Sequence, residues 1–358
     1  MLIGDMGTRP SLKTVAAAAG VSVSSASNAY NRPGQLSDEV RERIFRVASE
    51  QGYSGPDTAA RTLRGKRAGA IGVLLTERLS YAFSDPYSVG MLAGLAEVAE
   101  ESATSVTLIP IASHHREAAA AVERAVNAVQ QAVVDGVVAY CVDADHPARE
   151  VLRRRGLPVV SSSESDEPDA GLVLIDERAA AASVGRLLRE LGHTRVVEIL
   201  EGTDARTAPD VVDPADAKQL YQTERERLAG FRAGLGDAAE ITVVAAGRNV
   251  ESAGYAAAEL ALDSPHPPTA LLAHSDVLAL GALRAVLDRG LVPGVDVSVT
   301  GFDDIPAAAA AGLTTVTQEI QERGRLLGRM LLDPSYTLRR VVLPTTLQVR
   351  RTTGPARH

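Results

Sequence analysis

Apolar residues recur about every 3.6 positions near the start of the chain, which predicts two short helices separated by a glycine turn over residues 14–30. Ser11 and Ser22 stand where each helix needs an N-cap, and Gly20 permits the turn. A third helix is predicted over 37–51, with Ser37 as its cap. The apolar positions of the first two helices are Val15, Ala16, Ala19, Val21, Ala26 and Tyr30. Three short helices can close over one small core.

The outward face of the second helix is small and mostly polar. It carries Val23, Ser24, Ser25 and Asn28. A helix-turn-helix presents its second helix to the major groove of DNA, and an Asn carboxamide can pair with the edge of an adenine. The competing interpretation is an ordinary solvated helix face. The pattern therefore gives a DNA-binding hypothesis rather than a proof.

Residues 54–67 form a basic linker in which Ala59, Ala60 and Leu63 fall on one side and Gly65 interrupts the pattern. A segment shorter than roughly 12–15 residues is marginal as an isolated helix. We expect it to fold when it pairs with the same segment of a second copy on DNA.

Beyond residue 69, buried apolar runs alternate with Ala-rich helical periods. This alternation predicts parallel, doubly wound sheets, with enough strands for two of them. The predicted strands are 70–75, 106–111, 136–140, 159–161, 173–175, 196–200, 241–245, 270–273 and 297–300, and the helices are 90–102, 117–132, 179–191, 228–235, 253–262 and 277–289. Ligands of such folds bind beyond the carboxyl ends of the strands, here between two facing lobes.

Charge is unevenly distributed along the 358 residues. The formal net charge is −8, yet residues 1–70 contain ten Lys or Arg against six acids, so this part carries +4 and the remainder −12. A basic segment ahead of an acidic body is typical of a nucleic-acid-binding module joined to a partner domain.

Composition excludes several other classes. One cysteine, Cys141, rules out an internal disulfide, and we expect no cofactor. His114 and His115 lack a third ligand at metal spacing, so we expect no metal. No Walker, dinucleotide or Gly-x-Ser-x-Gly pattern is present, so no enzyme is expected. The sequence shows no export signal or long apolar run, and a cytoplasmic protein is expected.

A series of motifs, each weak alone, resembles the lactose-repressor/galactose-repressor family of transcriptional regulators. The resemblance runs from about Ser11 to the C-terminus, and the order and spacing of the motifs make it specific. Its parts are Ala19-Gly20-Val21-Ser22 with Ser27 and Asn31, Ala59-Ala60 with Leu63, Leu191-Gly192-His193, Arg227 with Gly230-Phe231, Ser275-Asp276, Gly301-Phe302-Asp303-Asp304, Gln318 and Val349-Arg350-Arg351.

The resemblance implies an all-α helix-turn-helix headpiece (1–55), a hinge helix (56–68) and an α/β core (69–358) of two interleaved Rossmann-like subdomains similar to periplasmic binding proteins. It also implies that the protein binds a pseudo-palindromic operator as a homodimer and acts as a repressor. Recognition helices enter successive major grooves and paired hinge helices enter the minor groove, where Leu63 wedges between base pairs. A small effector between the lobes modulates DNA affinity, as inducer or as corepressor.

DNA contacts are expected from three groups of residues. Bases would be read by Val23, Ser24 and Asn28, and phosphates would be contacted by Ser25, Ser27, Arg61 and Arg64. Ser11, Asn31, Ala60 and Leu63 complete the set through the family motif. Relatives commonly carry Arg where Asn28 stands, so the usual half-site of the family should not be assumed.

The resemblance places Asp276 and Arg227 in the effector cleft, with Phe83, Asp176, Ser275 and Gln318 as lesser candidates. A carboxylate can accept from vicinal hydroxyls and a guanidinium can donate in a fork. Alternatively, Asp276 caps a helix and Arg227 forms a structural ion pair.

Two departures from the family bear on the effector. Ser163 and Tyr140 stand where sugar-binding relatives often place Asp and a small polar residue. The resemblance therefore does not by itself identify the effector as a sugar. The stretch 203–223 is longer than its counterpart and should lie near the cleft mouth. A solute-binding receptor and an α/β enzyme without DNA binding remain the alternative functions.

Overall fold

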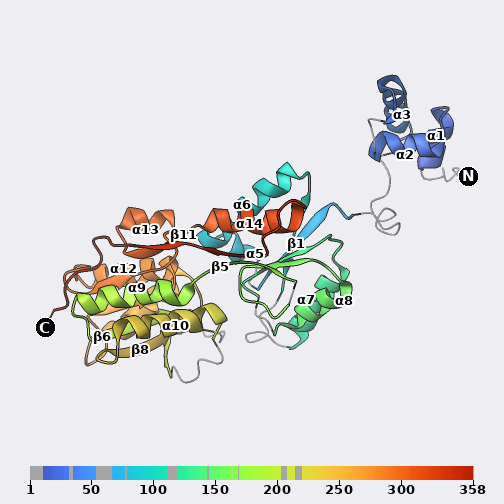
Figure 1. Cartoon of the computed structure of the whole chain (residues 1–358). Coiled ribbons are helices and arrows are strands. Elements are labelled where there is room, and N and C mark those ends of the chain that lie inside the picture. The colour runs from blue at the N-terminus through green and yellow to red at the C-terminus, as the bar shows by residue number, and fades with distance from the viewer. Residues whose placement is uncertain are drawn as a thin grey trace, which may run out of the picture. The chain divides into compact units, whose positions relative to one another are not determined.

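The structure is a computed structural model that describes residues 11–31, 35–53, 67–76, 79–111, 119–142, 145–167, 169–202, 208–213 and 220–357. The chain divides into two compact units, residues 1–68 and 69–358 (Figure 1). The hinge residues Ala60, Arg61, Leu63 and Arg64 lie outside the described residues. The predictions made for them are therefore carried forward as proposals.

The first unit contains three helices, α1 (Leu12–Ala18), α2 (Val23–Asn31) and α3 (Asp38–Glu50). Their apolar faces meet in one small core that includes Val15, Val21 and Tyr30, as the helical spacing predicted, together with Ala29, which it did not name. Tyr30 packs edge-on against Phe45 with ring centroids 5.0 Å apart. This edge-to-face contact adds to the packing of α2 against α3.

The second unit consists of two α/β lobes. The N-terminal lobe has a six-stranded parallel sheet in the order β12-β5-β4-β3-β1-β2. Its strands are β1 (Ala70–Leu75), β2 (Ser105–Pro110), β3 (Val137–Tyr140), β4 (Val159–Ser161), β5 (Gly171–Ile175) and β12 (Arg340–Leu343). Helices α6 (Pro86–Glu101) and α14 (Ile320–Leu332) cover one face, and α7 (Ala119–Gln131) and α8 (Pro147–Arg155) cover the other, with the short α5 (Leu79–Ala82) after β1.

The C-terminal lobe has a five-stranded sheet in the order β10-β9-β6-β8-β7, in which only the pairing of β7 with β8 is antiparallel. Its strands are β6 (Arg195–Leu200), β7 (Asp210–Val212), β8 (Glu240–Ala245), β9 (Ala270–Ala273) and β10 (Ser298–Thr300). Helices α9 (Glu177–Glu190) and α10 (Gln222–Leu235) pack on one face, and α11 (Glu251–Leu262) and α12 (Asp276–Asp288) on the other, with α13 (Pro306–Ala311) following β10. The expected doubly wound α/β class is confirmed.

The chain passes between the lobes three times, after β5, after β11 (Thr315–Gln318) and before β13 (Thr345–Gln348). Strands β11 and β13 pair with each other as a separate two-stranded sheet beside the C-terminal lobe. The apolar pattern of the sequence did not predict α5, α8, α13, α14, β7, β12 or this small sheet. Of these, the small sheet, α14 and β12 return the chain to the N-terminal lobe and place Gln318 and Arg323 next to the space between the lobes.

Glycines set the spacing of the paired helices. A Cβ on Gly94 of α6 would lie 1.9 Å from the carbonyl oxygen of Gln321, just after the start of α14, and a Cβ on Gly254 of α11 would lie 2.2 Å from the carbonyl oxygen of Leu278 of α12. Both distances are far below van der Waals contact, so only glycine permits these helix pairs to approach so closely.

Candidate functional site

The helix-turn-helix is built by local hydrogen bonds. Ser11 and Thr14 form a reciprocal capping box at the start of α1, with 3.2 Å from the Thr14 amide to Ser11 Oγ. The Ser25 amide donates to Ser22 Oγ at 2.9 Å, which confirms Ser22 as the cap of α2. Gly20, at φ +65°, makes the turn between them. These contacts fix α2 on the headpiece core.

The outward face of α2 is only partly as expected. Val23 is 48% exposed and Ser24 is exposed, as a base-reading surface requires. The Ser25 hydroxyl bonds to Ser22 Oγ at 2.9 Å. The Asn28 side-chain amide donates to Gln35 Oε1 at 3.2 Å, so DNA would have to share or displace this partner. Gln35, near the start of the next segment, is a neighbour that sequence reasoning missed.

A cavity of about 170 Å³ lies between the lobes. Its volume suits a molecule of monosaccharide size, below the usual range for drug-sized ligands. The N-terminal lobe contributes Asp85, Tyr87, Tyr140 and Arg323, and the C-terminal lobe contributes Arg227, Asn249, His274, Ser275 and Asp303. The end of the 203–223 stretch also reaches the lining through Tyr221, Gln222 and Thr223.

Arg227 is fixed by three contacts on the C-terminal side of the cavity. Its Nε donates to Glu177 at 2.7 Å, and its Nη1 donates to the backbone carbonyl of His274. Its guanidinium lies 3.8 Å from the ring centroid of Phe302. Both members of the ion pair are nearly buried, with side chains 12% and 11% exposed. Arg227 therefore serves as a structural partner of Glu177 and also faces the cavity.

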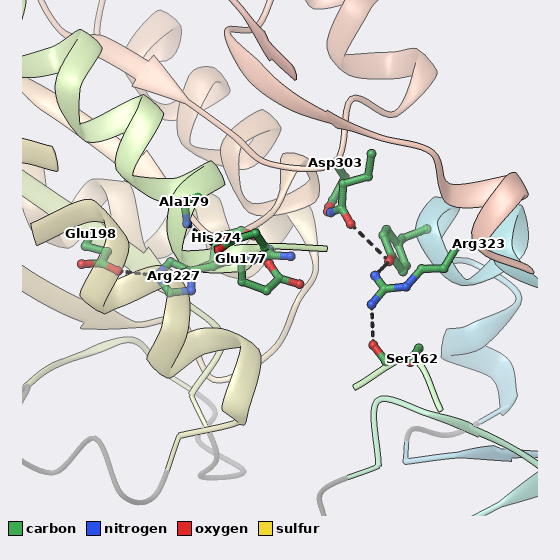
Figure 2. A network of polar contacts seen from close by, with 11 residues as sticks. Ser162, Glu177, Ala179, Glu198, Arg227, His274, Asp303 and Arg323 are labelled. Atoms are coloured by element: carbon green, nitrogen blue, oxygen red, sulfur yellow. Dashed lines mark hydrogen bonds and ion pairs between the residues drawn. The ribbon is translucent and has the colours of Figure 1, made fainter. Parts of the chain in front are cut away.

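Beneath Arg227 lies a buried pair that sequence reasoning missed. His274 Nε2 and Glu198 Oε1 are hydrogen-bonded, and their side chains are 4% and 1% exposed (Figure 2). His274 and Glu198 are on neighbouring strands or their ends, since β6 pairs with β9. The pair holds His274 in the cavity wall, where its carbonyl positions Arg227.

Asp276 is fully buried and is not in the cavity lining. Its carboxylate accepts from Thr315 Oγ1 at 2.6 Å and from the Ile305 amide at 2.9 Å. Burial raises its pKa to about 6. The cap of α12 is Ser275, whose Oγ accepts from the Leu278 amide at 3.2 Å, so the alternative that Asp276 is that cap is wrong. Asp276 joins the start of α12 to β11 and to the loop before α13.

The lesser effector candidates occupy different places. Ser275 lines the cavity and donates to Asn249 Oδ1 at 2.5 Å. Asp176 caps α9 and lines an adjoining hollow of about 400 Å³. Phe83 is 63% exposed and is not in the lining. The structure therefore brings Arg227 and Ser275 together at the cavity and leaves Asp176 and Phe83 outside it.

Gln318 links the two lobes by hydrogen bonds to Tyr87 and Asp303. Its Oε1 accepts from Tyr87 at 3.3 Å, and its Nε2 donates to Asp303 Oδ1 at 2.7 Å. Tyr87 in turn accepts from Arg323 Nη1 at 2.5 Å. Hydrogen bonds thus run from Arg323 and Tyr87 of the N-terminal lobe through Gln318 to Asp303 of the C-terminal lobe. Asp303 has φ of 126°, a backbone conformation that is costly outside glycine and is kept at this lobe junction.

Desolvation in the cavity changes the acidity of its groups. Burial raises the pKa of Asp303 well above its usual range, although the charge of Arg227 opposes this. Desolvation also raises the pKa of the Tyr87 hydroxyl above its usual value. Both shifts favour the uncharged forms of these groups.

Neither a membrane span nor a metal centre is found in the described part of the chain. None of the described helices is long and apolar enough to cross a bilayer. The described residues contain no group of three or more His, Cys, Asp or Glu arranged to hold a metal ion. His114 and His115 lie outside the described residues.

A helix-turn-helix headpiece joined to a two-lobed core with a cleft defines a ligand-responsive DNA-binding regulator. Residues 11–55 match the family described as bacterial regulatory proteins, lacI family, and residues 186–353 match a periplasmic binding protein-like domain. An HTH-type transcriptional regulator of Mycolicibacterium smegmatis is 39% identical over 362 residues, 97% of each chain. The regulator IpsA of Corynebacterium glutamicum is 36% identical and covers 96% of this chain and 97% of its own. The chain belongs to the lacI family.

Solved structures agree with this assignment. A lacI-family regulator from Corynebacterium glutamicum has a TM-score of 0.71 and 32% identity, covering 98% of this chain and 99% of its own. The lac repressor dimer bound to operator and the anti-inducer ONPF has a TM-score of 0.73 and 25% identity, covering 97% and 100%. The chain is thus a DNA-binding transcriptional regulator, and the sequence-based resemblance is confirmed.

Proposed function

We propose that the chain is a dimeric repressor in the cytoplasm, without catalytic activity, that binds a pseudo-palindromic operator. A small polyhydroxylated metabolite that binds in the cleft would lower or raise the affinity of the dimer for this operator. The observation that carries the effector part is the cavity between the lobes with Arg227 in its lining, fixed between Glu177 and His274. Arg227 retains N–H donors for hydroxyl groups, and the neighbouring Ser275 and Asn249 add donors and acceptors.

Relatives support the effector and dimer parts of the proposal. One similar structure is a complex of the regulator CelR with cellobiose, at 27% identity and a TM-score of 0.64, covering 96% of this chain and 100% of its own. A ribose operon repressor of Escherichia coli is 27% identical over 347 residues. The operator complex of the lac repressor contains a dimer. We extend dimeric operator binding and a sugar-like effector to this chain on that basis.

For DNA binding, we assign the reading of bases to Val23, Ser24 and Asn28. Ser27 and Asn31 would lie near the sugar-phosphate backbone of the DNA. Exposure of Val23 and Ser24 supports this assignment. A methyl-bearing side chain such as Val23 suits contact with a thymine methyl group. From the sequence, Ala60 and Leu63 would enter the minor groove and Arg61 and Arg64 would contact phosphates.

The test begins with selection of operator sequences from random DNA by the full chain, followed by gel shift on the selected site. Val23→Ala should weaken binding to that site by at least about tenfold if Val23 packs against a base. Val292→Ala is the matched control, because Val292 is 51% exposed and lies in the core unit. Leu63→Ala should weaken operator binding while leaving effector affinity nearly unchanged. Failure to select any pseudo-palindromic sequence would contradict the proposed function.

The effector part is tested separately by thermal shift with sugars and nucleosides, because a ligand of the folded state raises the melting temperature with occupancy. Any compound that stabilises the chain should alter operator affinity, and operator should alter its affinity by the same factor. A stabilising compound with no effect on operator binding would contradict the coupling.

A further inference from the structure

Arg323 of α14 is a buried cation whose direct contacts are all with neutral groups. The residue as a whole is only 5% exposed to solvent. Its three nitrogens donate to the Val173 carbonyl at 3.1 Å, to the Tyr87 hydroxyl at 2.5 Å and to the Ser162 carbonyl. Figure 2 shows the contact with Ser162. Among the described residues, no carboxylate forms an ion pair with it. A buried charge without an opposite charge in contact is costly.

The neutral groups around Arg323 are poor sources of a counter-charge. Desolvation raises the pKa of the Cys141 thiol to about 11 and raises that of the Tyr87 hydroxyl further above its usual value. Both groups therefore stay protonated near neutral pH. The positive charge of Arg323 is left facing the cavity that its side chain lines.

Most carboxyl groups of the cavity wall already have protein partners. Of the five carboxyl groups in the described lining, Asp85 accepts from Ser88, Glu177 from Arg227, Glu224 from the amides of Gly202 and Tyr221, and Asp303 from Gln318. The fifth, Glu201, is on the C-terminal lobe, where it also has an interaction. Of the first four, only Glu177 has a cationic partner, Arg227, and among the described residues none of these carboxyl groups contacts Arg323 of the N-terminal lobe.

We propose that the effector carries an anionic group, a phosphate or a carboxylate, and that Arg323 binds it. This inference rests on the proposed function, because it takes the cleft to be the effector site. Three of the five guanidinium N–H donors have partners in the protein, which leaves two for a forked, charge-assisted pair with an anionic oxygen. The cavity of about 170 Å³ suits a compound of the size of a monosaccharide phosphate or a sugar acid.

The arrangement assigns the two ends of the effector to different lobes. The anionic end would contact Arg323 on the N-terminal lobe, and hydroxyl groups would contact Arg227 and Asn249 on the C-terminal lobe. In Figure 2, Arg323 with Ser162 and Arg227 with Glu177 and His274 lie on opposite sides of the view. An effector that bridges both sides would stabilise the lobes in one relative position.

The experiment measures melting temperature of the full chain in inorganic phosphate against chloride of equal ionic strength, and in ribose, ribose 5-phosphate and ribonate. Phosphate should stabilise the wild type saturably. Arg323→Gln should weaken the apparent phosphate affinity at least about tenfold, and Arg323→Lys should retain part of it. Arg340→Gln is the matched control, since Arg340 pairs with Glu164 near the cavity with its side chain 53% exposed, and it should respond like the wild type.

Several results would overturn the proposal. These are an equal phosphate response in wild type and Arg323→Gln, no response of the wild type to phosphate or either anionic sugar, or a stronger response to ribose than to its anionic forms. Comparison of ribose 5-phosphate with ribonate tells phosphate from carboxylate. If circular dichroism shows that Arg323→Gln does not fold, the proposal is tested by the phosphate response of Arg323→Lys and by the responses of the wild type to ribose, ribose 5-phosphate and ribonate. If the wild type binds no selected operator, the proposed function is contradicted, whatever the phosphate result.

Discussion

Replacement of Arg227 by Met should separate its structural role from its role in the cleft. The change removes the guanidinium but keeps most of the stem, and it leaves Glu177 as an unpaired carboxylate in a site that is 11% exposed. Breaking a buried ion pair by removing one partner costs about 3–5 kcal/mol. Since both side chains keep slight exposure, we expect the lower end, about 3 kcal/mol, or a fall in melting temperature of roughly 6–12 °C.

The double variant Arg227→Met with Glu177→Gln is the decisive comparison. It removes the unpaired charge, so the destabilisation should shrink to about 1 kcal/mol. Effector affinity should stay low in both variants, because the donors of Arg227 are absent from each. The chain has no Trp, so urea unfolding is best followed by far-UV circular dichroism. A double variant as unstable as Arg227→Met would refute the ion-pair argument, and normal effector binding by either would refute the cleft assignment.

Further predictions concern buried groups and helix contacts. Because burial raises the pKa of Asp276 to about 6, the folded chain binds a proton there before the unfolded chain does, so acidification from about pH 7.5 to about pH 5.5 should stabilise the wild type relative to Asp276→Asn. His193 has the opposite sign, since burial lowers its pKa below that of the unfolded chain, and His193→Asn should lose less stability over the same interval, measured by urea unfolding at each pH. Gly94→Ala should destabilise the core by about 1–3 kcal/mol or more, because the new methyl group meets the carbonyl of Gln321, and a near-neutral result would show that α6 and α14 can move apart easily. Ser11→Ala should destabilise the headpiece by about 1 kcal/mol in a melt that resolves it, and no change would argue against the capping box.

Local interactions explain why the headpiece could be predicted from sequence. The third helix was expected over 37–51 and is observed as Asp38–Glu50, because its cap, its apolar stripe and Gly52 are all within a few residues of one another. The helix expected over 90–102 starts earlier, at Pro86, since Asp85 caps it and Pro is favourable in the first turn. Such boundaries depend on which local capping residue the tertiary structure selects.

The α/β core was predictable as a class but not in its returning elements. Buried parallel strands read as apolar runs, such as Ala70–Leu75, so most of them were visible in the sequence, whereas the largely exposed parallel strand β12 was not. The helix α14 was missed although its apolar residues, among them the buried Leu326, Leu327 and Met330, have the spacing of an amphipathic helix. Arg323 of this helix is buried only because α14 packs into the N-terminal lobe.

The sequence by itself determined the helix-turn-helix, the α/β class, the family and the assignment of Arg227 to the cleft, because each depends on local periodicity or on a motif of neighbouring residues. Only the tertiary structure decided that Asp276 lies outside the cavity lining, that Glu198 supports His274, and that Arg323 lines the cavity with no ion pair to any of the described residues. These facts depend on contacts between segments tens to hundreds of residues apart, such as the 236 positions between Tyr87 and Arg323. Burial and charge pairing at such distances are set by the packing of the lobes, which no local pattern encodes.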